Sequence, residues 1–224
     1  MTKKKVKAAP VNEIDETIAA GSSFVEKHFK ALCLSIGGIV AVIIISLLVN
    51  QYYIIPRNAE AADNIAVAEQ LFLTGDYEKA LNGDGVNDGF LQIVDKYGST
   101  PSGNLARLYA GLCYAHTDKA EEAVKYLEGF DVCDDAMVSN AAIGALGNCY
   151  AQINMNDKAA STLLKAAKRA DNNTLSPLYY LQAGQLFEAI GQKNKALECY
   201  ETIKNEYPQS VQRQDIDKYI ERVK

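Results

Sequence analysis

The chain has 224 residues, a formal net charge of −5 and 48% hydrophobic residues, a balance that suits one folded domain plus a further segment. Residues 57–224 hold 17 basic and 24 acidic side chains, because residues 1–56 contain only six lysines and four acidic residues. This net charge of −7 argues against a nucleic-acid partner, which needs a basic patch. The two histidines are far apart, no cysteines have metal-ligand spacing, and no phosphate-binding glycine motif occurs. We therefore predict no catalytic residues, no metal site, no cofactor and no small-molecule substrate.

The amino-terminal 30 residues are predicted to form a basic tail followed by an amphipathic helix. Lys3, Lys4, Lys5 and Lys7 crowd the first residues, a composition typical of a disordered terminus. Hydrophobic residues then recur at near-helical spacing over 13–30, with charged residues between them. This pattern predicts a helix on a membrane surface, although a solvated extension of the following helix fits equally well.

An uncharged, almost wholly apolar run extends from Ala31 to Ile55. A helix needs about 20 such residues to cross a membrane, so we predict a single transmembrane helix over residues 31–55, in contact with membrane lipid. Tyr52 and Tyr53 lie where an interfacial aromatic belt is expected. A cleaved signal peptide is the competing interpretation, but its apolar region should be about 7–15 residues long and close to the charged start.

Basic residues are unevenly distributed around this apolar run. All six lysines of the first 56 residues precede it, and Lys27 and Lys30 flank it directly, whereas only Arg57 lies close on the other side. Because positively charged flanks stay in the cytoplasm, we expect a cytoplasmic amino terminus and an extracytoplasmic carboxy-terminal part.

A recurring spacing of small and large residues dominates the rest of the chain. Small residues recur where two helix backbones would approach each other, and larger residues recur where the gap widens. The packing positions are Ala68, Gly75 and Ala80; Gly111, Tyr114 and Ala123; Gly147, Tyr150 and Ala159; and Gly184, Phe187, Gly191, Ala196 and Tyr200. One such helical hairpin cannot bury its faces alone, so several of them must stack.

This pattern resembles the tetratricopeptide repeat family, whose helical hairpins recur at about 34 residues. The family's small, aromatic, glycine, alanine and aromatic positions fall on Gly184, Phe187, Gly191, Ala196 and Tyr200, although the anchor glycines here are 36 and 37 residues apart. Together with the apolar run, the resemblance predicts an all-α fold: one transmembrane helix, then an α-solenoid of about four hairpins and a capping helix. The predicted domains are residues 1–30, 31–55 and 57–224, with repeats near 59–97, 102–132, 137–170 and 176–208 and a cap over 211–224.

Three glycines within residues 82–89 interrupt the second helix of the first repeat, because glycine is costly inside a helix. Asp84 and Asp88 suggest a calcium loop, but Val86 breaks the alternation of oxygen ligands and no glutamate closes the motif. We therefore predict a structural loop. Ser102 is the predicted N-cap of the second repeat.

Cysteines recur within the repeats. Cys113 and Cys149 occupy the same position of successive repeats, and Cys199 lies on a second helix. Equivalent positions on stacked helices are about 8–10 Å apart, which is too far for a disulfide. We therefore expect free, buried thiols.

In the family, the first helices of the hairpins line a concave groove, so the resemblance implies a protein or peptide partner. By position, the partner-binding candidates are Leu108, Leu112, Asn148, Gln152, Leu181, Gln185 and Glu188. The alternative is that several of these are core residues or idle surface. Some members bind a terminal carboxylate through basic residues in the groove, but the matching positions here are not basic. Apolar anchors and a weak dependence on salt are therefore expected.

The layout of basic tail, single span and repeat array is similar to that of membrane-anchored repeat proteins of bacterial envelopes, including the ancillary subunit of the Sec translocon. The resemblance implies a single-pass protein of the bacterial inner membrane, with a cytoplasmic amino terminus and periplasmic repeats. The first functional hypothesis is an interaction scaffold that assists envelope protein assembly or translocation. A chaperone-like holdase for unfolded clients and an enzyme with an unrecognised site are the alternatives.

Overall fold

The structure, a computed structural model, describes residues 11–135 and 137–224, and leaves the side chains of residues 11–28 and 32 undescribed. The predicted basic tail and the side chains of the predicted amphipathic helix before residue 29 therefore lie outside the described part. Contacts divide the chain into two units, residues 1–54 and residues 55–224.

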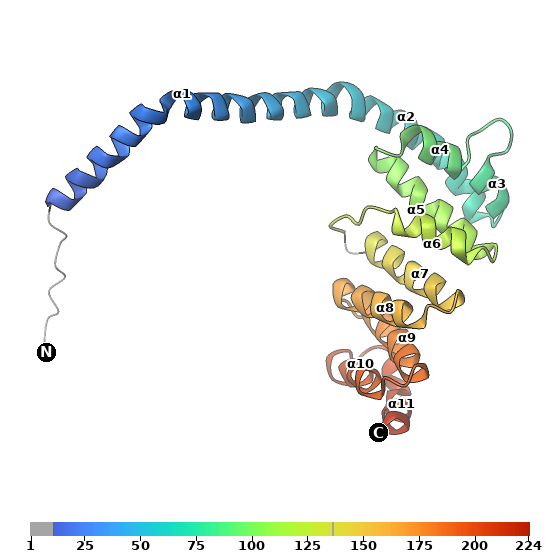
Figure 1. The fold of residues 1–224 in the computed structure, drawn as a ribbon. Helices are drawn as coiled ribbons and strands as arrows, with labels where there is room; N and C mark the ends of the chain where they lie inside the picture. Colours follow the sequence, from blue (N-terminus) through green and yellow to red (C-terminus); the bar gives the residue numbers. More distant parts are fainter. Residues whose placement is uncertain (1–10, 136) are drawn as a thin grey trace, which may run out of the picture. The chain divides into compact units, whose positions relative to one another are not determined.

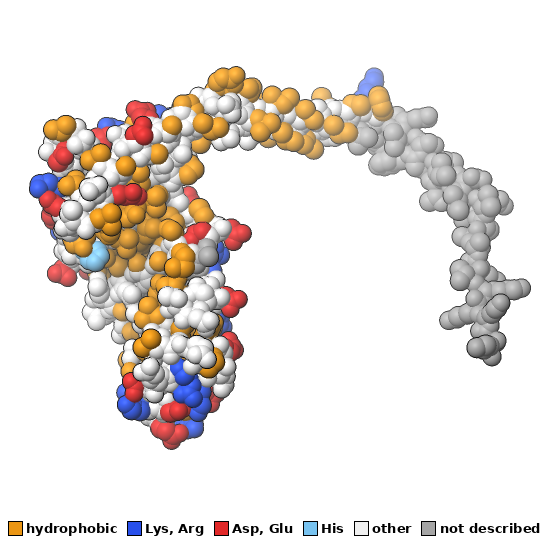
Figure 2. All heavy atoms as spheres, turned by 180° about the vertical axis from the view of Figure 1, so that it is seen from behind, with side chains coloured by type: hydrophobic (Ala, Val, Ile, Leu, Met, Phe, Trp, Pro, Cys, Tyr) orange, Lys and Arg blue, Asp and Glu red, His pale blue; other side chains and the backbone are white. Residues whose placement is uncertain are grey.

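The first unit is a long helix that is almost wholly apolar from Ala31 to Val49. Helix α1 spans Val11–Val49 and is followed by a π-helical turn, η1, over Asn50–Ile54. From Leu34 to Val49 the large hydrophobic side chains are 47–80% exposed, and Figure 2 shows hydrophobic side chains along the described part of this helix. Within the described residues, one helical stretch, Phe29–Leu73, is long and apolar enough to cross a membrane.

The described part of the second unit is a stack of four helical hairpins followed by a terminal helix (Figure 1). The helices are α2 (Ile55–Leu73) with α3 (Tyr77–Asn82) and α4 (Phe90–Tyr97); α5 (Pro101–His116) with α6 (Ala120–Glu128); α7 (Val138–Gln152) with α8 (Asn156–Ala170); α9 (Ser176–Ala189) with α10 (Lys193–Glu206); and then η2 (Val211–Gln214) and α11 (Ile216–Val223). No strand occurs among the described residues. The predicted all-α fold of repeated hairpins with a terminal helix is confirmed.

Glycine brings the two helices of each of the last three hairpins into close contact. A Cβ atom at Gly111 would lie 2.7 Å from Leu127 Cγ, and one at Gly147 would lie equally close to Leu163 Cγ. At Gly184 the added atom would lie 2.4 Å from the Tyr200 ring. At each glycine, a large side chain of the second helix therefore packs directly against the backbone of the first helix.

The turn inside each hairpin uses a left-handed backbone conformation. The residue seven positions after the small packing residue has a positive φ in all four hairpins: 82° at Gly75, 55° at Asp118, 60° at Asn154 and 78° at Gly191. Asparagine and aspartate adopt this conformation more readily than other side chains. The hairpins therefore share one turn geometry although only two of them have the turn glycine.

The start of the second hairpin differs from the prediction. Helix α5 begins at Pro101, and its N-cap is Thr100, whose hydroxyl accepts a hydrogen bond from the Gly103 amide at 3.0 Å. The predicted N-cap at Ser102 is wrong, because proline at the first helical position places the capping residue just before it.

Three clusters of buried side chains form the core, and each joins neighbouring hairpins. Phe90 and Ile93 pack with α5 residues in the first cluster, whereas Leu127 packs with α7 residues in the second. The third cluster joins the last two hairpins and the terminal helix. There Gly144 of α7 lets the Tyr179 ring of α9 approach, since a Cβ at Gly144 would lie 2.3 Å from Tyr179 Cζ. Stability thus depends on contacts between hairpins as well as within them.

Helix α11 covers α10 with the apolar face formed by Ile216, Ile220 and Val223. Arg222 donates hydrogen bonds to the Glu188 carboxylate from Nε at 2.5 Å and from Nη2 at 2.8 Å, and the Tyr200 hydroxyl donates a third at 3.0 Å.

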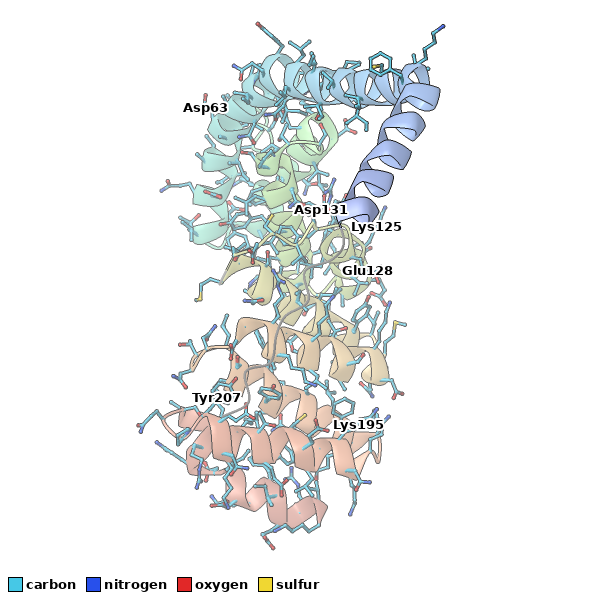
Figure 3. The ribbon with its side chains drawn as sticks, turned by 90° about the vertical axis from the view of Figure 1, so that its left-hand side faces the viewer. Asp63, Lys125, Glu128, Asp131, Lys195 and Tyr207 are labelled. Carbon is cyan, nitrogen blue, oxygen red and sulfur yellow. The ribbon has the colours of Figure 1, made fainter. Side chains whose placement is uncertain are left out.

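Helix α10 is also fixed at both ends, which Lys195 and Tyr207 mark in Figure 3. The Lys195 ammonium lies 5.2 Å from the centre of the Phe187 ring, and Tyr207 packs against Tyr180. The last hairpin is therefore held at both ends of α10 and on its outer face.

Replacing Gly147 with leucine should destabilise the fold by about 1–3 kcal/mol, because the new side chain would enter space that Leu163 fills. The measurement is urea unfolding of the full chain in detergent, followed by circular dichroism. Asn148→Leu is the matched control: Asn148 is the next residue on the same helix and is exposed, so the change should be within about 0.5 kcal/mol. Equal stability of the two variants would contradict the packing described for Gly147.

Replacing Glu188 with glutamine should make the fold less sensitive to acid. Hydrogen bonds from Arg222, and to a lesser extent from Tyr200, hold the pKa of Glu188 below its ordinary value of 4.5. A carboxylate whose pKa is depressed in the folded state stabilises the fold above its unfolded pKa, and this contribution is lost as the pH falls through the folded pKa. The melting temperature of the full chain should therefore fall more between about pH 6 and about pH 3 than that of Glu188→Gln.

The control for this experiment is Glu201→Gln, an exposed glutamate of α10 without an ion pair among the described residues. Its acid sensitivity should equal that of the unchanged chain. If Glu188→Gln also behaves like the unchanged chain, the contact between Glu188 and Arg222 does not stabilise the folded state.

Candidate functional site

The first helices of the second and third hairpins enclose an apolar pocket of about 290 Å³. Its lining is Leu105, Leu108, Tyr109 and Leu112 of α5 with Val138, Ala141 and Ala142 of α7. Figure 2 shows a hollowed hydrophobic patch on this unit, beside the pale-blue histidine side chain. An apolar pocket with so few polar groups favours the binding of an apolar side chain.

Aromatic rings extend this surface from the pocket toward the first hairpin. The Phe72 ring meets the Tyr109 ring edge to face, with 5.2 Å between centroids, and Tyr109 also stacks on Phe90 at 5.0 Å. Farther along, the Tyr77 ring stacks on His116 at 4.5 Å. Rings that pack against one another keep their orientation, so this wall of the groove is preformed.

The pocket has no basic lining residue, and its one phenol is uncharged. Burial, followed by the nearby Glu69 carboxylate, raises the pKa of Tyr109 above its ordinary value of 10.0. Tyr109 therefore keeps its proton at neutral pH. These groups suit non-covalent binding, since the pocket offers neither a nucleophile nor a base.

The predicted partner-binding residues have different positions in the structure. Leu108 and Leu112 lie together in the pocket, but Leu108 is only 5% exposed and forms part of the wall. Asn148 and Gln152 of α7 are exposed, and Leu181 of α9 is half-buried against the core.

The other two predicted residues, Gln185 and Glu188, contact the terminal helix α11. Gln185 donates to the Tyr219 hydroxyl at 3.4 Å, and Glu188 accepts the hydrogen bonds of Arg222. Glu188 is therefore engaged in holding the cap, which argues against it as a partner contact.

Sequence reasoning missed Tyr109 and Val138 as lining residues. Tyr109 is four residues after Leu105, a spacing that places both on one side of α5. Val138 begins α7 and remains 46% exposed, so it lies at the open rim of the pocket.

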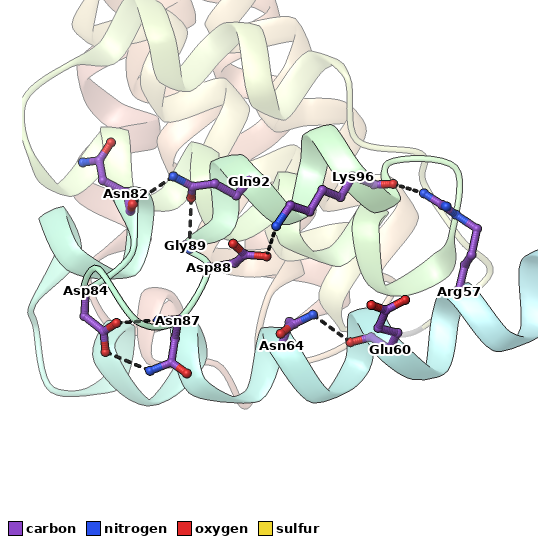
Figure 4. Close-up of polar contacts among 10 residues, drawn as sticks. All are labelled: Arg57, Glu60, Asn64, Asn82, Asp84, Asn87, Asp88, Gly89, Gln92 and Lys96. Atoms are coloured by element: carbon purple, nitrogen blue, oxygen red, sulfur yellow. Dashed lines mark hydrogen bonds and ion pairs between the residues drawn. The ribbon is translucent and has the colours of Figure 1, made fainter.

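The loop over residues 82–89 is closed by its own hydrogen bonds (Figure 4). The Asp84 carboxylate accepts from the amides of Val86 and Asn87 and from the Asn87 side chain, and these bonds lower the pKa of Asp84 to about 2. Asp88 pairs with Lys96 at 2.6 Å. Both carboxylates therefore shape the loop, and no group of three or more His, Cys, Asp or Glu in the described part of the chain could hold a metal ion.

The comparisons with known proteins agree with this architecture. Residues 179–210 match the family described as tetratricopeptide repeat. Among solved structures, the chain is similar to a putative kinesin light chain from Podosopora anserina with nearly identical TPR-like repeats, with a TM-score of 0.56 and 16% identity over 74% of this chain and 86% of that chain. It is also similar to MamA, with a TM-score of 0.50 and 19% identity over 70% of this chain and 92% of that chain.

At these identities the likeness to solved structures shows the fold alone, and no curated protein matches the chain. None of these comparisons indicates a catalytic family. The family match thus covers one repeat, residues 179–210, and the solved structures share the helical-hairpin fold of the second unit.

Proposed function

We propose that this chain is a membrane-anchored scaffold whose concave face binds a segment of a partner protein. The observation that carries the proposal is the apolar pocket between α5 and α7, which a scaffold needs for a partner side chain and which has no catalytic group. Partner contacts come from Leu112, Asn148, Gln152 and the pocket rim.

The anchor in this proposal is the apolar helix of residues 31–55. Its uncharged length, and the exposure of its hydrophobic side chains, suit a lipid environment. The lysines before it favour a cytoplasmic amino terminus, with the repeats on the other side of a bacterial inner membrane. The layout resembles that of envelope repeat proteins such as the ancillary Sec translocon subunit, so a role in envelope protein assembly or translocation is part of the proposal.

A discrete partner is favoured over the holdase alternative by the size and rigidity of the pocket. About 290 Å³ admits one or two large side chains, and packed aromatic rings form the adjoining wall. Proteins that hold many unfolded clients use adaptable surfaces rather than one small fixed pocket.

Cys133 provides a native reporter of topology. It is exposed in the loop before α7, whereas Cys113, Cys149 and Cys199 are buried, and burial raises the pKa of Cys113 and Cys199 to about 12. Only a thiolate reacts readily, and lipid shields Cys33 if residues 31–55 span the membrane. A membrane-impermeant maleimide should therefore label spheroplasts but not sealed inside-out vesicles, and Cys133→Ser should abolish the signal. Labelling of inside-out vesicles would place the repeats in the cytoplasm and contradict the proposed orientation.

Photocrosslinking in native membranes tests the groove. A benzophenone amino acid in place of Val138, at the pocket rim, should give one or a few discrete adducts with other proteins. The matched control is the same replacement of Val211, which is 76% exposed and lies in η2 outside the groove. Leu112→Asn should reduce the Val138 adducts, because it removes an apolar lining group. A continuous ladder of adducts would instead support the holdase, and equal adducts from both positions would contradict groove binding.

A further inference from the structure

The charge of the repeat domain is concentrated in its first half. Residues 57–137 contain 15 acidic and 6 basic residues, whereas residues 138–224 contain 9 acidic and 11 basic residues. The first half therefore carries a formal charge of −9 and the second half +2. The total of −7 conceals this difference, and the apolar pocket lies where the two halves meet.

The basic residues of the first half leave most of its carboxylates uncompensated. Lys79, Lys96 and Lys119 pair with Asp76, Asp88 and Glu78, respectively. Arg107 donates to the Gly129 carbonyl at 3.0 Å, and Arg57 donates to the Lys96 carbonyl. Within the described residues, the acidic side chains of this half outside those pairs and Glu128 have no ion pair.

Exposed carboxylates lie just beyond the carboxy-terminal end of helix α5 and in the loop that contacts its amino-terminal end through Asn104. Asp118, Glu121 and Glu122 lie just after its carboxy-terminal end, at the turn into α6. Asp131 and Asp134 lie in the loop that leads to α7. We call these five residues the acidic rim.

The loop part of the acidic rim is held in place by α5. The Asn104 side chain donates to the Asp131 carbonyl at 2.8 Å and accepts from the Asp131 amide at 2.8 Å. At the other end of the loop, the Asp135 carboxylate accepts hydrogen bonds from the Met137 and Ser139 amides at the start of α7. These bonds hold the backbone of the loop, while the Asp131 and Asp134 side chains stay exposed to an oppositely charged partner.

From this arrangement we propose that the groove takes a basic amphipathic protein segment, with an apolar side chain in the pocket and lysine or arginine residues facing the acidic rim. The proposal rests on the groove-binding function above and names the chemistry of its partner. Phosphate-bearing partners and terminal carboxylates are repelled by the same rim and find no cation in the pocket. A second copy is a weaker match, because its own second half has a charge of only +2.

The uneven charge changes the expected dependence on salt. The lack of basic groove residues, taken alone, predicts that binding depends weakly on salt. Carboxylates within about 8 Å of a bound lysine act on it at physiological ionic strength and are screened when salt rises. Affinity should therefore fall with salt, while the apolar anchor keeps binding measurable.

The test uses the full chain in phosphatidylcholine nanodiscs and two capped, fluorescent peptides. Both contain a Phe-Leu pair, which lysines flank in one peptide and glutamates in the other. The lysine peptide should bind by fluorescence anisotropy after subtraction of empty nanodiscs, and raising sodium chloride from about 50 mM to about 300 mM should weaken it about fivefold or more. The glutamate peptide should bind at least about tenfold more weakly.

Matched variants separate the pocket from the rim. Val138→Ser should weaken binding of the lysine peptide about fivefold, and the same substitution at Val211, which is exposed outside the groove, should not. The triple variant Glu121→Gln, Glu122→Gln and Asp134→Asn should weaken it about fivefold or more. Its control, Glu198→Gln, Glu201→Gln and Glu206→Gln, makes the same change in net charge on exposed residues of α10 and should leave affinity unchanged.

Each contrary result has a distinct meaning. If the glutamate peptide binds as tightly and still depends on Val138, the groove function stands and the charge preference is overturned. Equal effects of the two triple variants on affinity would likewise overturn the charge preference and leave the groove function standing. If neither peptide binds but Val138 still crosslinks to discrete partners, the partner chemistry proposed here is wrong and the scaffold is not. Loss of both binding and groove-specific crosslinking would overturn the proposed function itself.

Discussion

The close approach of the two helices in each hairpin is the constraint on which the rest of the fold depends. Leu127, Leu163 and Tyr200 reach the opposite backbone only because Gly111, Gly147 and Gly184 have no side chain. The same closeness fixes which faces of the first helices remain free. Two of those faces line the pocket between α5 and α7, so the pocket depends on glycines that are not themselves part of its lining.

The hairpins could be predicted from the sequence because their signal repeats. A single small residue at helical spacing says little, but the same spacing in four segments identifies both the helices and the turns. Asp118 and Asn154 show why the pattern survives substitution, since their backbones adopt the left-handed turn that Gly75 and Gly191 also use. The N-cap at Thr100 was missed because Thr100 and Ser102 lie on either side of Pro101 and both have a hydroxyl group. In the structure it is the Thr100 hydroxyl that accepts the hydrogen bond from the Gly103 amide.

The groove was harder to predict than the hairpins, since position within a repeat does not report burial. Leu108 has a groove position but lies 95% covered in the wall, while Val138, at the start of a helix, remains open at the rim. Glu188 was predicted for a partner, yet Arg222 lies 34 residues away in sequence and engages it. The contact between Arg222 and Glu188 arises from the packing of α11 on the last hairpin, and the residues next to Glu188 in the sequence do not indicate it.

The terminal helix also limits where a partner can bind. Tyr219 and Arg222 contact Gln185 and Glu188, which are groove positions of the last hairpin. The groove residues free of the cap therefore belong to the first three hairpins, and the first two of these lie in the half with a charge of −9. The apolar pocket lies at the edge of the acidic half, since α5 belongs to that half and α7 to the other. A partner that matches both features combines an apolar side chain with positive charge. A neutral helix would leave the exposed carboxylates without partners, and an acidic helix would be repelled by the carboxylates of the first two hairpins.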